Sequence, residues 1–383
     1  MRKYFQLEQK LIRALLLIVV LGLSSCVKED GDELIQETSD VITWDVVTNG
    51  MQNSRALVEN DDMLQTACST GGKSIGIWSA YELNGVVIKN VLGNSTGDVG
   101  LFYHKDTQWD NYKWWTYGAE AEKWVKGAKY TFNAYYPMNV VNEISSSDVS
   151  TFVIDYNTER HQEDLMTAYA FVDTKAPSFK TTTPVTLKML HTLSALKFRF
   201  SFMNRDGSTY KDSDALTSFW LENTEYDKGF ATTGVLAFGT INEDGSVDGE
   251  HIHWYHEDHP EPSTSERERK IYAWDDENGV NFSSTTSSRT VATAYSTNFN
   301  GAQKYSDKDG WVLTIPQELD GTSRICFRLK STGNLIHRVA LPEITFEAGK
   351  RYIYDVCFSQ SDVTLKISIA DWNELKSSQD IPL

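Results

Sequence analysis

The densest group of potential metal ligands is a run of histidines in the second half of the chain. These are His251, His253, His256 and His259, interleaved with acidic and aromatic residues. In an extended strand, His251 and His253 would point to the same face, and imidazole is a common metal ligand. The segment is polar, however, and no CxxC or HExxH pattern accompanies it. We therefore expect a solvated loop with no metal and no cofactor, and a metal site here is the alternative.

Patterns for enzymatic chemistry are weaker. The sequence GGKS at 71–74 is similar to the end of a phosphate-binding loop, but that loop needs a glycine where this chain has Ala67. No carboxylate spacing singles out an acid–base pair. A formal net charge of −17 disfavours binding to nucleic acid phosphates. We therefore expect a protein that is not an enzyme and has no nucleic acid partner.

The N-terminus has the pattern of a secretory signal followed by a lipid-attachment cysteine. Basic residues precede Ala14–Leu23, an apolar run that is too short to span a bilayer as a helix. The sequence LSSC then ends at Cys26 and resembles a bacterial lipobox. This pattern predicts that residues 1–25 are a signal peptide and that Cys26 is acylated, which would anchor the chain in a membrane. An ordinary cleaved signal with an incidental cysteine is the alternative. Residues 26–40 are acidic and polar, and we expect a flexible tether there.

Alternation of apolar and polar residues, which is typical of half-buried β-strands, dominates the rest of the chain. In the first such stripe, Ile42, Trp44 and Val46 point one way while the intervening residues point the other way. Similar stripes run through residues 128–136 and 363–369. Helical periodicity is scarce beyond the signal peptide. Many short strands separated by Gly, Asn, Asp and Ser indicate an all-β fold of sandwiches or barrels.

A chain of 383 residues, 40% of them hydrophobic, favours two domains that each bury a core. Between His191 and Ala195 the apolar residues change from odd to even positions, as expected for a bulge or for a strand that crosses between sheets. We expect His191 to be a hydrogen-bonded, partly buried residue. We place the boundary just before this region. Residues 41–183 are then an N-terminal β-sandwich and 184–383 a C-terminal β-sandwich with a polar insertion around 242–287.

Cysteines and tryptophans leave two further questions open. Beyond Cys26, the chain has Cys68, Cys326 and Cys357, and a disulfide between the last two is an open alternative. Trp109, Trp114 and Trp115 belong to a dense aromatic group. Aromatic faces stack on sugar rings, so an exposed group would indicate a surface glycan-binding lipoprotein. The interpretation that we favour is that these rings fill the first core.

Six local patterns together resemble the fimbrillin-like (Mfa-like or FimA-like) family of Bacteroidetes. They are GKSIGIW at 72–78, YTFNAYYP at 130–137, DLMTA at 164–168, VTLKMLHTLSALKFRF at 185–200, FEAGKRYIY at 346–354 and IADW at 369–372. Each pattern is weak alone, but their order from the lipobox onward makes the resemblance specific. The resemblance implies two tandem transthyretin-like Greek-key β-sandwich domains after a lipoprotein signal peptide. It also implies a place in a fimbrium at the cell surface, as an outer membrane lipoprotein that assembles with other fimbrial subunits.

The resemblance also implies a route of assembly. In family members that polymerise, an arginine-specific protease cuts just past the first strand, and the matching positions here are Arg55 and Ala56. The first strand would then leave, and a strand donated by a neighbouring subunit would fill the groove that Ile42, Trp44 and Val46 had plugged. The alternative is that Arg55 is simply an exposed loop arginine.

The C-terminus bears on the position of the chain within a fimbria. The residues after Trp372 are mostly polar, so they would make a short and poor donor strand. A tip or accessory subunit is therefore favoured over a stalk subunit, because a tip subunit needs an acceptor groove and no donor. As an adhesin, the chain would have a host or bacterial surface protein or glycan as its partner.

Overall fold

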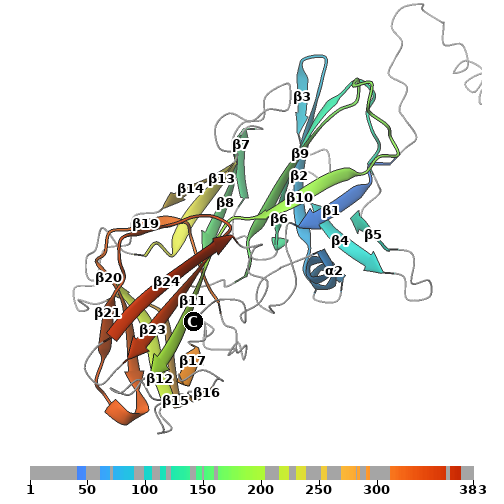
Figure 1. Cartoon of the computed structure of the whole chain (residues 1–383). Helices are drawn as coiled ribbons and strands as arrows, with labels where there is room; N and C mark the ends of the chain where they lie inside the picture. Colours follow the sequence, from blue (N-terminus) through green and yellow to red (C-terminus); the bar gives the residue numbers. More distant parts are fainter. Residues whose placement is uncertain are drawn as a thin grey trace, which may run out of the picture. The chain divides into compact units, whose positions relative to one another are not determined.

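The computed structural model describes most of the chain beyond residue 40. The described residues are 41–48, 61–69, 72–89, 99–105, 113–117, 122–138, 144–148, 151–158, 163–202, 215–223, 230–238, 252–256, 269–281, 283–284, 290–293, 311–358 and 363–371. Nearly all of their regular structure is β-strand, which confirms the all-β fold class (Figure 1). Within these residues the α-helix is α2 (Asp61–Ser69), and no helix is long and apolar enough to cross a bilayer.

The largest sheet is built from strands of the first half of the chain. Its order is β1 (Trp44–Thr48), β10 (Val185–His191), β9 (Met166–Asp173), β6 (Lys129–Tyr136), β2 (Ile75–Leu83), β4 (Val99–Lys105) and β5 (Lys113–Tyr117), and β3 (Val86–Lys89) also pairs with β2. The pairing of β1 with β10 is parallel, and the remaining pairs of this sheet are antiparallel. β1 is therefore a terminal strand of its sheet.

Strands of the second half form further sheets. One has the order β16 (Ser283–Ser284), β17 (Thr290–Thr293), β11 (Ser194–Phe202), β23 (Lys350–Phe358) and β24 (Val363–Asp371), with β18 (Val312–Thr314) also on β11. Another has the order β15 (Arg269–Asn281), β12 (Ala215–Asn223), β20 (Ser323–Leu329) and β21 (His337–Ala340), and a short pair joins β19 (Gln317–Leu319) to β22 (Ile344–Phe346). A short 3₁₀-helix, η2 (Lys330–Thr332), follows β20.

One sheet combines strands from both halves of the sequence. Its order is β14 (Ile252–His256), β13 (Thr233–Phe238), β8 (Thr151–Asn157) and β7 (Ile144–Asp148). The pairing of β8 with β13 crosses the predicted boundary at residue 184, and β10 lies in the same sheet as β9. The division into two tandem domains and the insertion around 242–287 therefore stay predictions.

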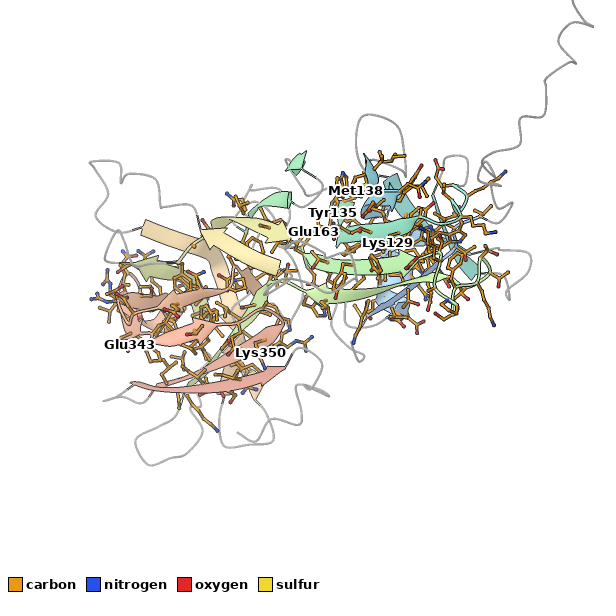
Figure 2. The ribbon with its side chains drawn as sticks, turned by 90° about the horizontal axis from the view of Figure 1, so that it is seen from above. Lys129, Tyr135, Met138, Glu163, Glu343 and Lys350 are labelled. Carbon is orange, nitrogen blue, oxygen red and sulfur yellow. The ribbon has the colours of Figure 1, made fainter. Side chains whose placement is uncertain are left out.

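The buried residues gather in three hydrophobic cores. The first core lies against one face of the largest sheet and includes Ile77, Trp124, Tyr130, Phe132 and Leu187. The second core lies between sheets of the second half and includes Phe198, Phe219, Ile325, Phe327 and Tyr354. The third core draws on both halves and includes Trp78, Tyr135, Leu193, Trp311 and Ile353, with Met138 packed against it (Figure 2).

The third core explains a glycine within β2. A Cβ atom at Gly76 would overlap the ring of Tyr135, which pairs with it from β6 and is 1% exposed. A glycine inside a strand commonly marks such a close approach of a neighbouring group. Gly76 therefore lets an aromatic ring lie directly on the sheet.

The chain passes from one sheet to another where the sequence predicted a change of face. β10 ends at His191 in the largest sheet, and β11 begins at Ser194 in a different sheet. Thr192, between them, is tied down by two hydrogen bonds to the carbonyl oxygen of Leu165, of 3.0 Å from its backbone N–H and 2.7 Å from its hydroxyl. The change of parity thus marks a crossing between sheets.

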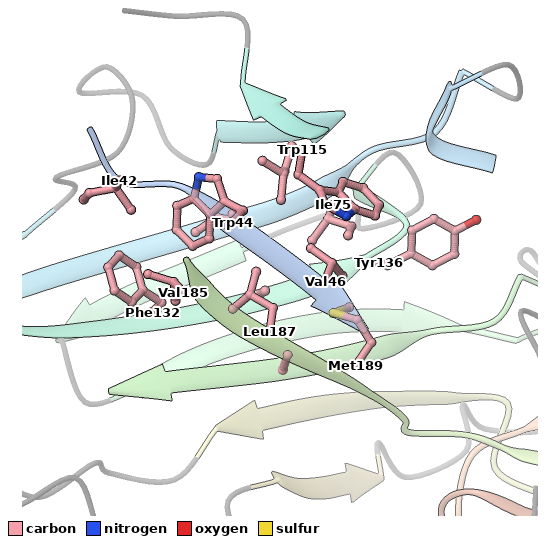
Figure 3. Packing of buried hydrophobic residues seen from close by; sticks show 14 of the residues in the cluster. Ile42, Trp44, Val46, Ile75, Trp115, Phe132, Tyr136, Val185, Leu187 and Met189 are labelled. Atoms are coloured by element: carbon pink, nitrogen blue, oxygen red, sulfur yellow. The ribbon is translucent and has the colours of Figure 1, made fainter. Parts of the chain in front are cut away.

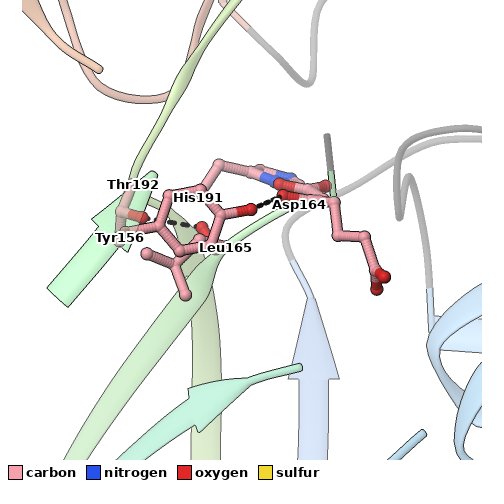
Figure 4. A network of polar contacts seen from close by, with 6 residues as sticks. Tyr156, Asp164, Leu165, His191 and Thr192 are labelled. Carbon is pink, nitrogen blue, oxygen red and sulfur yellow. Dashed lines mark hydrogen bonds and ion pairs between the residues drawn. The ribbon is translucent and has the colours of Figure 1, made fainter. Parts of the chain in front are cut away.

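His191 is buried at this crossing and has a buried acidic neighbour. Its Nδ1 lies 3.0 Å from Oδ1 of Asp164 (Figure 4). Beside this pair, the Tyr156 hydroxyl donates a 2.6 Å hydrogen bond to the carbonyl oxygen of Glu163. His191 is therefore hydrogen-bonded as expected, although it is more fully buried than the sequence indicated.

Candidate functional site

The first strand inserts one apolar face into the first core. Ile42, Trp44 and Val46 are 2%, 6% and 2% exposed, whereas Thr43 and Asp45 between them are exposed. This alternation is the expected behaviour of a strand with one buried face. The residues predicted to plug a groove therefore lie together on the buried side of the strand (Figure 3).

The part of the first core that lies under β1 is apolar. The Trp44 ring meets Phe132 of β6 edge-on, with ring centroids 5.3 Å apart and ring planes at 86°. Other buried members of the first core line the strand in Figure 3, namely Ile75, Trp115, Tyr136, Val185, Leu187 and Met189. An edge-to-face aromatic contact contributes roughly 0.5–1.5 kcal/mol beyond the area that it buries. Trp44 is therefore the largest single anchor of the strand.

Backbone pairing holds β1 along one edge. It pairs in parallel with β10, from Trp44 opposite Val185 to Thr48 opposite Met189, and the Val185 N–H donates a 2.8 Å hydrogen bond to the Thr43 carbonyl oxygen. Ahead of the strand, the Ile42 N–H donates to the Glu122 carbonyl oxygen at 2.9 Å. Because β1 ends the sheet, its side chains contribute much of its attachment.

A helix meets the end of the strand. The Asp61 carboxylate at the start of α2 accepts two hydrogen bonds from Thr48, of 2.5 Å from the backbone N–H and 2.8 Å from the hydroxyl. Further along α2, Leu64 and Cys68 are buried in the first core. Asp61 therefore ties the last residue of β1 to a helix that shares the same core.

The titratable groups near the groove favour their neutral forms. Burial raises the pKa of the Cys68 thiol to about 12. Burial also raises the pKa of Tyr130 to about 12, although its hydroxyl accepts a 2.7 Å hydrogen bond from the Val125 N–H, which lowers it. For Tyr136, burial first, and then nearby Cys68 and acidic groups, hold the pKa well above its usual range. The groove therefore suits an apolar segment.

Several predicted site residues lie outside the described residues. These are Cys26, Arg55, Ala56 and Trp109, together with His251 and His259. His253 and His256 fall in β14, which is a strand paired with β13 and not the expected loop, and Trp114 falls in β5; the side chains of these three residues lie outside the described part of the structure. Among the described residues, no group of three potential metal ligands occurs. The lipidation, maturation and metal-site predictions therefore stay predictions.

The structure bears directly on two other expectations, for Trp115 and for the cysteine pair. Trp115 is 7% exposed and lies in the first core, with its ring centroid 5.1 Å from that of Tyr103. This burial leaves Trp115 little surface for a sugar ring, so the glycan-binding alternative depends on Trp109 and Trp114. Cys326 and Cys357 are both buried, and no disulfide joins them in this structure.

The sequence reasoning missed α2 and the role of Asp61. The available signal was weak, because α2 has nine residues and just two of them, Leu64 and Cys68, are buried. These two residues are one helical turn apart, and Asp61 and Asp62 are acidic residues in the first turn, where the helix dipole favours negative charge. That combination is a recognisable but short helix pattern.

Comparisons with known proteins address the fold and the family. The structure is similar to a crystal structure of a fimbrial protein from Bacteroides vulgatus, with a TM-score of 0.51 and 14% identity over 88% of this chain and 100% of that chain. It also matches the tip fimbrial protein Mfa3 from Porphyromonas gingivalis, with a TM-score of 0.31 and 9% identity over 78% of this chain and 95% of that chain. The search of curated proteins found no significant match.

The sequence itself matches the model of one protein family, described as fimbrillin-like. The match runs over residues 55–372, so it includes β10 and β24 and begins after β1. It covers well over half of the chain and agrees with the all-β fold and with the order of the six sequence patterns. On these grounds, the chain belongs to the fimbrillin-like family.

Proposed function

We propose that this chain is a fimbrial subunit or fimbria-associated adhesin that accepts a β-strand from another subunit in place of its own first strand. It is anchored in the outer membrane through Cys26 and matured by cleavage after Arg55. The observation that carries the proposal is the placement of β1, a terminal strand whose buried residues fill an apolar groove. Membership of the fimbrillin-like family supports the same function.

The exchange has a clear physical basis. Removal of β1 would expose the apolar floor of the groove and the backbone groups of β10 that now face β1. An unpaired strand edge beside an apolar surface is a template for an incoming strand. A donated strand would restore the backbone hydrogen bonds, and its alternate side chains would enter the places of Ile42, Trp44 and Val46.

The position in the fimbria is part of the proposal. A chain that accepts a strand but donates none belongs at a tip or in an accessory place. The apolar stripe that could serve as a donor lies in β24, which pairs with β23 along all nine of its residues. Release of β24 would break this nine-residue antiparallel ladder, which supports the tip or accessory role.

The test combines cleavage with a strand that can be supplied from outside. The purified chain is treated with an arginine-specific protease, and mass spectrometry identifies the new N-terminus. We expect a stable core that begins at Ala56. A labelled peptide with the sequence of residues 41–48 should bind this core and not the uncut chain, as measured by fluorescence polarisation.

Matched controls separate the steps of the exchange. A peptide with aspartate at the positions of Ile42 and Val46 keeps the backbone but loses the apolar face, so it should not bind. The variant Arg55→Gln should resist cleavage at this site and leave the groove closed. Equal binding of both peptides, or binding to uncut chain, would contradict the strand-exchange mechanism. A core that degrades without a stable fragment starting at Ala56 would contradict the maturation step.

A further inference from the structure

A second part of the largest sheet presents apolar surface to solvent. β2 and β3 form a hairpin in which three consecutive residues of β3, Val86, Val87 and Ile88, are 60%, 48% and 41% exposed. The turn is Asn84-Gly85, and both residues have positive φ, of 51° and 78°, as a two-residue hairpin turn requires. A rigid turn thus holds an exposed apolar strand.

The outer edge of β3 also carries unused backbone groups. In a two-residue hairpin, the residues that flank the turn form a hydrogen-bonded pair, here Leu83 and Val86. Val87 lies opposite Glu82 in the next, non-hydrogen-bonded pair, so its N–H and C=O point away from β2. Among the described strands, β3 pairs with β2 alone. Within the described part of the chain, Val87 therefore offers a donor and an acceptor at an open edge.

We propose that β3 pairs with β3 of a second copy of this chain, antiparallel and with Val87 on the twofold axis. A lipid surface would accept the apolar side chains but offers no partner to the Val87 N–H and C=O, whereas another strand satisfies both. The edge lacks the proline and bulge that commonly block such pairing, and its charged residue, Lys89, stands at the end.

The register follows from side-chain faces and charge. With Val87 opposite Val87 of the second copy, Val86 lies opposite Ile88, and both share a face with Tyr81 and Leu83 of β2. This arrangement makes one continuous apolar stripe across four strands. A register centred on Lys89 would instead place like charges opposite each other, which destabilises a sheet.

The contact is small, because each β3 has four residues. Stable protein interfaces bury about 1,200–2,000 Å² in total, and two such strands bury less. The pairing is therefore weak between single subunits and becomes effective where many copies are held together, since linked sites act at high effective concentration. Copies displayed along neighbouring fimbriae or on one membrane would meet this condition.

Cysteine cross-linking tests the register. Paired residues across an antiparallel hydrogen-bonded pair have Cα atoms about 5.5 Å apart, within the range that a disulfide can bridge. In the purified full chain, Val87→Cys should form dimers under mild oxidation roughly tenfold faster than Leu335→Cys, which is 58% exposed but lies outside any strand. The unsubstituted chain, oxidised in the same way, measures how much dimer its own cysteines form.

Two further variants distinguish this register from any other. Val86 and Ile88 face each other across the axis, so a mixture of Val86→Cys and Ile88→Cys should cross-link readily. Each of these alone should not, because its Cα atoms lie about 8 Å apart. Cross-linking of all variants at the rate of Leu335→Cys would overturn the proposal.

A second measurement does not depend on disulfides. Sedimentation of the unsubstituted chain at high concentration should show a monomer–dimer equilibrium that salt strengthens, because two chains of net charge −17 repel each other. Val87→Lys places like charges on the axis and should abolish the dimer, whereas Leu335→Lys should leave it unchanged. The proposal would be overturned if the chain stayed monomeric at all concentrations and co-sedimented with phosphatidylcholine vesicles. Loss of this co-sedimentation in Val87→Lys would then assign the hairpin to a lipid surface.

Discussion

The first and last strands of the described chain are both terminal strands of their sheets, but they are held in different ways. β1 pairs with β10 over five residues, in parallel, and buries Trp44 and Val46, and Ile42 just before the strand is also buried. β24 pairs with β23 over nine residues, antiparallel, and its inner residues Leu365 and Ile367 are partly buried. Its residue Ile369 is 57% exposed. Of the two strands, β1 has the more fully buried side chains and β24 has the longer backbone ladder.

This difference indicates which strand can be exchanged. A strand attached by side chains in a groove can be replaced by any extended segment that repeats the same apolar alternation. A strand joined to its neighbour by a long antiparallel ladder and a short connection re-forms its own pairing quickly, because the closing loop is short. The comparison therefore supports the proposal that the acceptor site lies at β1 and that β24 stays in its sheet.

The release of β1 is expected to have its largest effect on the rate at which Cys68 is alkylated, because Cys68 shares the first core with β1. With a pKa of about 12, its thiol is almost entirely protonated at pH 8, so alkylation should be roughly a thousandfold slower than for a free cysteine. Release of β1 after cleavage should remove most of this protection, as measured by mass spectrometry after iodoacetamide treatment. Unchanged protection after release would show that α2 and its core do not depend on β1.

The next largest effect is expected from Trp44→Ala. The loss of a buried tryptophan and of its contact with Phe132 should lower the free energy of unfolding by about 3–5 kcal/mol. Urea denaturation followed by circular dichroism measures this change. Trp44→Phe keeps an aromatic ring in the groove and should lose clearly less. If both variants unfold like the original chain, β1 contributes little to the native state.

A smaller effect is expected from Asp61→Ala, which removes both hydrogen bonds to Thr48. A lost charge-assisted hydrogen bond typically costs about 1.5–3 kcal/mol, and the partly exposed site reduces this to about 1–2 kcal/mol. After cleavage, the first strand should also dissociate faster from Asp61→Ala than from the original chain. The release rate of a labelled N-terminal fragment measures this difference. Asp62→Ala, at the neighbouring position, is the control and should leave the release rate unchanged.

The smallest effects are expected in β24. Ile367→Ala removes a partly buried side chain and should lower the free energy of unfolding by about 1–2 kcal/mol. Ile369→Ala removes an exposed one and should stay within about 0.5 kcal/mol of the original chain. The same urea experiment compares them with Trp44→Ala. A loss at Ile369 as large as at Trp44 would erase the contrast between the two strands.

The alternation of side chains predicted the faces of strands well, because it depends on local geometry alone. The buried set Ile42, Trp44 and Val46 and the crossing after His191 both follow from a period of two. The pattern cannot show which strands pair. The parallel pairing of β1 with β10, far along the chain, depends on the packing of the whole sheet.

Short elements and side-chain contacts were also beyond the sequence. A nine-residue helix is not stable alone, so the packing of Leu64 and Cys68 decides its existence. The two hydrogen bonds of Asp61 depend on where that helix meets β1. Trp115 illustrates the limit for single residues, because its sequence neighbourhood allowed either a surface or a core position and tertiary packing decided for the core.

The parallel direction of β1 and β10 has a mechanical consequence. β10 continues directly into β11, so a pull on the N-terminal end of β1 is opposed through the C-terminal end of β10. Two parallel strands loaded in this way slide past each other, and their hydrogen bonds share the force instead of breaking one by one. Tension along the tether would therefore load the pairing of β1 with β10 in shear, and after a proteolytic cut beyond β1 only this pairing and the contacts of the strand would resist it.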